Sequence, residues 1–202
     1  MNTPWRYSID MAVLPDIITP ELYDLMTGKR YQGDSRIEPS IASASAMVRS
    51  YCGWHLAPAL PCVFKTRMLD KRISIVDRDI LVQLPCRGVI DVKSVSINNT
   101  EMTNIDIDES TLRIFDAFPV SRKDLVKIDY IAGLEEPFTA LIQEIVADRI
   151  THGLAQSYGV TSEAAGGVSV TYNSNWTSGG GTGALSEVNM RSLEPYRLAG
   201  VF

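Results

Sequence analysis

Three segments of the chain place hydrophobic residues at the spacing of an amphipathic helix. The first opens at Thr19-Pro20-Glu21, where Thr is a favourable N-cap, Pro fits the first turn and the carboxylate complements the helix dipole. The second extends from about Ser35 to Gly53, and its expected buried face consists of Ile37, Ile41, Ala44, Val48 and Tyr51. The third opens at Pro137 and ends at Gly159.

Between the second and third helices, apolar and polar residues alternate and β-branched side chains are frequent, which is typical of strands. We expect strands at 72–76, 80–84, 89–97, 105–107, 111–114 and 125–131. Asn98-Asn99-Thr100 predicts a tight hairpin turn, because Asn tolerates the left-handed backbone that such turns require. Short strands with tight connections predict a small antiparallel sheet or barrel-like module.

The expected fold class is therefore α+β: a small helical bundle with an inserted antiparallel β-module and an extended C-terminal arm. The expected divisions are an N-terminal extension at 1–17, the bundle at 18–158 with the β-module inserted at about 70–133, and the arm at 159–202.

The segment after Tyr158 is rich in glycine, which raises the entropy cost of ordering it. It also contains an alternating run from Val168 to Tyr172, whereas disordered tails are poor in aromatic and β-branched residues. We interpret it as an arm that orders against another protein through strand addition and aromatic anchors. The expected partner-binding residues are Val168, Val170, Tyr172, Trp176, Leu193, Tyr196 and Arg197. The alternative is that Leu193 and Tyr196 fold back onto the helices of their own subunit.

Composition narrows the class of protein. A chain of 202 residues with 45% hydrophobic residues can bury a core, and it has neither an apolar run long enough to span a membrane nor a signal-peptide core at its start. Cys52, Cys62 and Cys86 form no CxxC pair, so we expect ordinary part-buried free thiols in a reducing compartment. The net charge of −5 argues against a grip on nucleic-acid phosphates.

The usual signatures of catalysis and ligand binding are missing from the sequence. His55 and His152 have no partners at the spacing of a catalytic triad or a metal site, and we interpret both as structural. The glycines at 179–183 lack the Lys of a phosphate loop, and the acidic run at 106–109 lacks the Gly and distal Glu of a calcium loop. We therefore expect no catalytic residues, no metal and no cofactor.

Several short motifs, taken together and in order, resemble the head–tail connector, or adaptor, proteins of tailed double-stranded DNA bacteriophages. They are Ile18-Thr19-Pro20-Glu21-Leu22, the segments 51–56, 84–95 and 125–133 (the last ending in Ile131-Ala132-Gly133), Gly167-Val168-Ser169-Val170, and Leu193-Glu194-Pro195-Tyr196-Arg197. The residues before Met11 precede the usual start of this pattern, and the segment 173–183 is longer than the pattern needs.

The resemblance implies a structural virion protein without enzymatic activity, located in the neck between capsid and tail and in the host cytoplasm before assembly. Its implied partners are the portal protein, copies of itself in a ring expected to be a dodecamer, and downstream neck or tail proteins. Genomic DNA would pass through the lumen without specific binding, and an acidic lumen would keep it from adhering. Candidates for the lumen carboxylates are the second helix and the loops around Asp106 to Glu109.

Three alternatives remain open at this point. The chain could be another ring component of the neck, such as a stopper or tail-completion protein. It could also be an enzyme with an unrecognised site, or a module that binds a small ligand.

Overall fold

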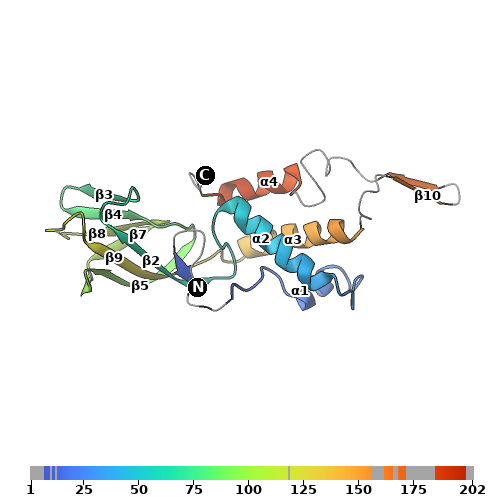
Figure 1. The fold of residues 1–202 in the computed structure, drawn as a ribbon, viewed down its shortest axis with the longest axis horizontal. Helices are drawn as coiled ribbons and strands as arrows, with labels where there is room; N and C mark the ends of the chain where they lie inside the picture. The colour runs from blue at the N-terminus through green and yellow to red at the C-terminus, as the bar shows by residue number, and fades with distance from the viewer. Residues whose placement is uncertain are drawn as a thin grey trace. The chain divides into compact units, whose positions relative to one another are not determined.

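The computed structural model describes residues 7–9, 11, 13–117, 119–155, 162–165, 168–171 and 185–198. These residues fold into two compact units (Figure 1). The β-module comprises Gly53–Thr139 with the described residues of Met1–Pro15 and Leu198–Phe202. The helical unit comprises Asp16–Cys52 and the described residues of Ala140–Arg197. The expected α+β class is confirmed.

The β-module contains a five-stranded and a four-stranded sheet, and every neighbouring pair of strands is antiparallel. The five-stranded sheet has the order β1 (Ser8–Ile9), β2 (Leu60–Arg67), β9 (Leu125–Ala132), β5 (Val89–Ile97) and β6 (Thr100–Glu101). The four-stranded sheet has the order β3 (Ile73–Val76), β4 (Asp79–Gln83), β8 (Thr111–Ile114) and β7 (Ile105–Asp108).

Each sheet buries one face, as the alternation in the sequence predicts. Alternate residues of β9 are fully buried, among them Val126, Ile128 and Tyr130. In the other sheet, Val82 and Leu112 are opposite one another and both are inaccessible to solvent. The buried faces of the two sheets form the core of the β-module.

The predicted hairpin turn is confirmed. Asn98 and Asn99 connect β5 to β6 with φ values of 50° and 66°, which Asn adopts at little cost. Two further tight turns use Asp77 (φ 57°) and Glu109 (φ 51°), the last residue of the acidic run at 106–109.

Strand β2 begins before the expected start of the β-module at about residue 70. Its buried positions alternate from Leu60 to Phe64, but Pro61 argues against a strand assignment because Pro cannot donate to a ladder. Pro61 is paired with Ile131 of β9, whereas the short strand β1 is paired with β2 only at Cys62 and Val63. Pro61 therefore lies where β2 has no strand on its other side, and the proline is tolerated.

A buried histidine links three parts of the β-module. The Nε2 of His55 donates to the carbonyl oxygen of Ala132 at 2.7 Å, and its Nδ1 accepts from the hydroxyl of Tyr7 at 2.7 Å. The same hydroxyl accepts from the backbone N–H of His55 at 3.1 Å. Because a carbonyl can only accept, Nε2 carries a proton, and we assign Nδ1 as the acceptor of the Tyr7 hydroxyl proton. His55 has the structural role expected of it, and Tyr7 joins the N-terminal segment to the core.

Two glycines allow close backbone approach beside this histidine. The N–H of Gly133 donates to the carbonyl of Gly88 at 3.0 Å. A Cβ atom on Gly88, whose φ is 64°, would lie 2.7 Å from the Gly133 oxygen, and one on Gly133 would lie 2.4 Å from the Cα of Ala59. The segments 53–56, 84–88 and 131–133 thus meet in one buried region, which we call the junction.

The helical unit contains α1 (Pro20–Met26), α2 (Ile37–Cys52), α3 (Phe138–Ala155, whose first two residues belong to the β-module), α4 (Glu187–Leu193) and the short 3-10 helix η2 (Glu194–Tyr196). The predicted N-cap is confirmed, because the Thr19 hydroxyl accepts from the N–H of Leu22 at 3.2 Å. The Tyr23 and Thr151 hydroxyls are 3.1 Å apart, and the N–H of Ile17 donates to Ser45 at 3.1 Å. These bonds join the start of the unit to α3 and α2.

The C-terminal region differs from the extended arm that we expected over 159–202. Residues 187–196 are helical, because Ser186 caps α4 by accepting from the N–H of Asn189 at 3.0 Å and Leu193 is buried. Extended structure is described only for the hairpin of β10 (Ser162–Ala165) and β11 (Val168–Thr171).

We predict that Tyr7→Phe lowers the free energy of unfolding of the β-module by about 1–3 kcal/mol, because the buried Nδ1 of His55 loses its donor. Urea unfolding followed by the fluorescence of the buried Trp54 would measure this. Tyr31→Phe is the control, because the buried Tyr31 hydroxyl has no hydrogen-bond partner. Equal stability of Tyr7→Phe and the wild type would contradict the assigned role of Tyr7.

We predict that Gly88→Ala destabilises the protein by roughly 2–4 kcal/mol, since the new methyl group would collide with the Gly133 carbonyl. Gly28→Ala separates this collision from backbone strain: Gly28 has nearly the same φ, 61°, but nothing within 4 Å of the added atom. Its expected cost is only about 1 kcal/mol. Equal losses in thermal or urea unfolding would mean that the close approach of Gly88 and Gly133 is unimportant.

Candidate interaction surfaces

The C-terminal helices are anchored to the end of α2. The Tyr51 hydroxyl donates to the Glu194 carboxylate at 2.7 Å and lies 3.2 Å from the Met190 carbonyl. This hydrogen bond, together with partial burial, raises the pKa of Tyr51. The guanidinium of Arg197 lies 5.3 Å from the centre of the Tyr51 ring and 3.6 Å from the Glu194 carboxylate. Tyr51 is therefore the residue of α2 that anchors the C-terminal segment from Met190 to Arg197.

Two further contacts fix α4 within the helical unit. The Asn189 side chain donates to the Asp148 carboxylate of α3 at 3.1 Å, and the Leu193 side chain is completely inaccessible. The Cys52 sulfur lies 4.0 Å from the Leu193 carbonyl. The segment 185–197 is thus a packed part of the helical unit of its own subunit.

The structure separates the predicted partner-binding residues into three groups. Leu193 is buried, while Tyr196 and Arg197 are partly exposed beside Tyr51. Val168 and Val170 lie in β11. Tyr172 and Trp176 lie outside the described residues. For Leu193 the structure matches the fold-back alternative. The sequence signal for packing of the C-terminal helices against α2 was the spacing that placed Tyr51 on the expected buried face of that helix.

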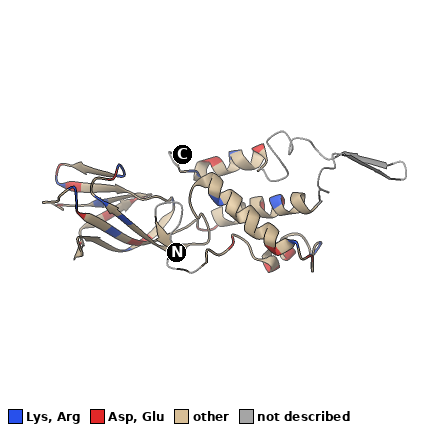
Figure 2. Ribbon diagram, viewed as in Figure 1, with Lys and Arg blue, Asp and Glu red and all other residues tan. Residues whose placement is uncertain are grey.

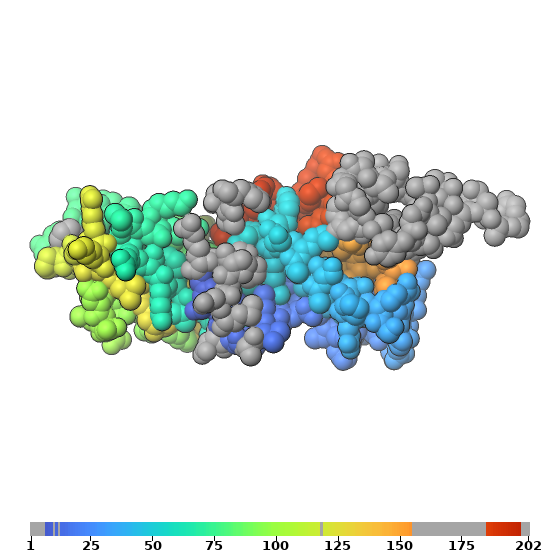
Figure 3. Space-filling model, viewed as in Figure 1, coloured from blue at the N-terminus to red at the C-terminus, as the bar shows by residue number. Residues whose placement is uncertain are grey.

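A cavity of about 340 Å³ lies between α2 and α3 in the helical unit. Small residues of α2, including Ser40 and Ser43, line one side, and α2 forms much of the visible face of this unit (Figure 3). Gly153 lets the Arg149 guanidinium lie against α3, because an added Cβ would be 3.0 Å from Nη1. Arg36 also lines the cavity, but its guanidinium binds both carboxylate oxygens of Asp34, with the shortest distance 2.7 Å. The charge of Arg36 is therefore compensated by Asp34.

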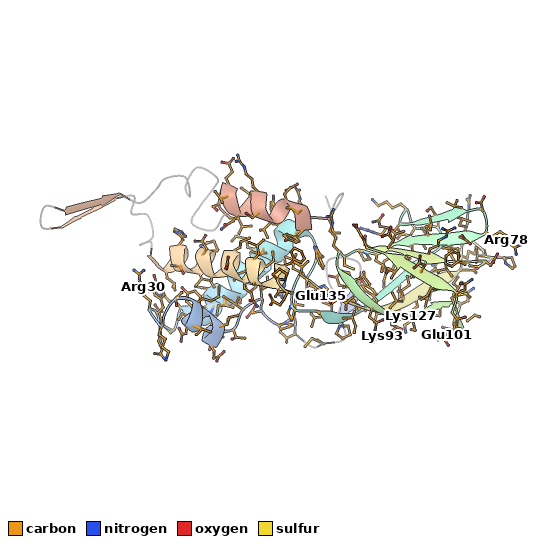
Figure 4. The ribbon with its side chains drawn as sticks, turned by 180° about the vertical axis from the view of Figure 1, so that it is seen from behind. Arg30, Arg78, Lys93, Glu101, Lys127 and Glu135 are labelled. Carbon is orange, nitrogen blue, oxygen red and sulfur yellow. The ribbon has the colours of Figure 1, made fainter. Side chains whose placement is uncertain are left out.

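The outer face of the five-stranded sheet carries paired charges. The Lys127 ammonium and the Ser94 hydroxyl donate to the same oxygen of Asp129 at 2.6 and 2.7 Å. Partial burial raises the pKa of Asp129, but these two hydrogen bonds outweigh it and hold the pKa below its ordinary value. Lys127 and Lys93 are labelled on the β-module in Figure 4, and Lys93 is itself paired with Asp91 at 2.5 Å.

Acidic and basic residues are interspersed over the described parts of both units (Figure 2). Asp106, Asp108 and Glu109, the carboxylates named as lumen candidates, are exposed on β7 and its turn. The second helix is a weaker candidate, because α2 carries a single carboxylate, Glu38. The acidic surface with the best support is therefore the β7 edge of the β-module.

Potentially reactive side chains are sequestered. Cys52, Cys62 and Cys86 are free and buried, and burial raises the pKa of each thiol to about 12. A neutral thiol is a poor nucleophile and a poor metal ligand. No three His, Cys, Asp or Glu side chains among the described residues are placed to hold a metal ion. None of the helices in the described ranges is both long and apolar enough to cross a membrane.

No family model matches the sequence, and no curated protein is significantly similar to it.

We predict that Leu193→Ala lowers the free energy of unfolding of the isolated chain by about 2–5 kcal/mol, because it leaves a cavity beneath α4. Val188→Ala on the same helix is the control, since Val188 is 72% exposed and its change should stay within about 0.5 kcal/mol. Urea unfolding of the monomer is the measurement. Unchanged stability combined with weakened binding to portal would instead make Leu193 a partner contact.

Proposed function

We propose that the chain is a structural subunit in the neck of a tailed double-stranded DNA bacteriophage. Identical copies would form a ring beneath the portal protein, extend the DNA channel and provide the platform for downstream neck or tail proteins. The chain would reside in the virion after assembly from the host cytoplasm, and it would perform no catalysis.

The observation that carries this proposal is the ordered set of motifs resembling the connector family. Three of them supply the residues of the junction: Trp54-His55-Leu56, Leu84 to Gly88, and Ile131 to Gly133. The resemblance therefore involves positions where backbone approach and burial restrict the choice of residue. Such positions determine a fold, so likeness at these sites supports a shared architecture more strongly than likeness at exposed sites.

The charge distribution supports a DNA conduit. Asp106, Asp108 and Glu109 form an exposed acidic run, and basic residues such as Lys127 and Lys93 are paired with carboxylates. A channel that must let DNA slide needs a weak and repulsive wall, because a few unpaired Lys or Arg contacts to phosphate would hold it.

Partner contacts are best sought in the segment between α3 and α4. Because 185–197 is packed within the helical unit, the docking function proposed for the arm falls on Val168, Val170, Tyr172 and Trp176, with Tyr196 and Arg197 at its boundary. Large aromatic side chains are the usual energetic anchors of interfaces.

We predict that the purified full-length chain binds isolated portal rings of the same phage and appears as an additional ring in electron micrographs. Trp176→Ala should weaken this binding by roughly 2 kcal/mol, or about thirtyfold, without changing the melting temperature. Val188→Ala, exposed on α4, is the matched variant that should bind like the wild type.

Failure to bind portal, with the chain remaining monomeric in the mixture, would contradict the proposal. Binding only to portal that already carries another neck ring would identify the chain as a stopper or tail-completion component.

A further inference from the structure

Three of the four sheet edges in the β-module are protected against strand addition. Strands β1 and β6, at the edges of the five-stranded sheet, have two residues each, and β5 beside β6 carries two register shifts and the exposed Lys93. Strand β7 carries two exposed carboxylates, and the Asp106 side chain accepts from the backbone N–H of Ile107 at 2.9 Å. Short strands, bulges and charges are the means by which proteins block their edges.

Strand β3 has none of these protections. Its sequence, Ile73-Ser74-Ile75-Val76, contains no charge and no proline, and it is paired with β4 without a register shift. Ile75 and Val76 are 46% and 50% exposed. Among the described residues no strand is paired with its other edge, so β3 presents backbone groups and apolar side chains to a further strand.

The chain itself carries a strand that matches this edge. Strand β11, Val168-Ser169-Val170-Thr171, has the length of β3 and the same alternation of β-branched residues with a hydroxyl. In the described part of the chain it is paired only with β10, and an isolated two-stranded hairpin is marginally stable in water. A third strand paired with β11 would stabilise this hairpin.

Charge does not oppose this pairing. The only charged residue from Ser162 to Thr171 is Glu163 of β10, and β3 itself carries no charge. The residues that flank β3 carry both signs: Asp70, Lys71 and Arg72 precede it, and Asp77, Arg78 and Asp79 follow it.

We propose that β11 of one copy pairs with β3 of the next copy and extends its four-stranded sheet. The inference rests on the proposed ring and identifies its intersubunit contact. Each copy offers one donor strand and one acceptor edge, which are different surfaces. Such a heterologous contact passes from copy to copy and closes when the rotation between copies allows it.

Cross-linking between Ser74→Cys and Ser169→Cys in the full-length chain tests the pairing directly. Oxidation of the portal-bound ring should give a ladder of covalent oligomers on non-reducing gels. A short bismaleimide, used in parallel, should link the two thiols if the register of the strand pairing leaves them too far apart for a disulfide. Either single variant should give at most a dimer, and the three native thiols are buried. A link within one chain, or no link with either reagent, would overturn the proposal.

Ile75→Lys provides a second test, because Lys on an edge strand opposes strand addition. The expected result is at least a tenfold higher protein concentration for ring formation, with unchanged melting of the monomer. Ile90→Lys is the matched control: Ile90 is 41% exposed at the β5 register shift, and its variant should assemble like the wild type. If the wild type fails to join portal, the proposed function is wrong; if both wild type and Ile75→Lys form rings at equal concentration, only the β3–β11 contact is wrong.

Discussion

The structure of the β-module depends on close backbone approach at the junction. Gly88 and Gly133 meet at a distance that leaves no room for a side chain, and this contact holds the end of β9 against the start of β5. His55 can then bond the Ala132 carbonyl with one nitrogen and the Tyr7 hydroxyl with the other. The junction thus holds together the N-terminal segment, the segment 53–56 and the ends of β5 and β9 in the five-stranded sheet.

Helices and strands with strong periodicity could be predicted from the sequence, because burial of one face determines the spacing of their apolar residues. The Thr19 cap, the Asn98-Asn99 turn and the long strand β9 all follow from local rules. Strand β2 was not among the expected strands, because proline usually argues against a strand. Pro61 is acceptable there only because β1 is paired with β2 at Cys62 and Val63 and not at Pro61. That circumstance is tertiary and cannot be read from local sequence.

The candidate site could be predicted only in part for the same reason. A glycine-rich segment predicted an arm, yet Leu193 is buried because Tyr51 and Asp148 bond the elements around it. The partners of these side chains lie far away in sequence, so spacing within the segment could not reveal them. The sequence likewise could not predict which sheet edges are protected, because the position of a strand in a sheet depends on its neighbours. The sequence predicted strands at β3 and β7, but only the sheet order distinguishes a blocked edge from an open one.

The central claim is that this chain is a repeated building block of a phage neck. A cryo-electron microscopy reconstruction of the neck in purified particles tests it most directly. The account predicts a ring of repeated density next to the portal, into each repeat of which the β-module and the helical unit can be fitted separately. Purified particles that lack the chain, or that contain it away from the portal-to-tail axis, would contradict the claim.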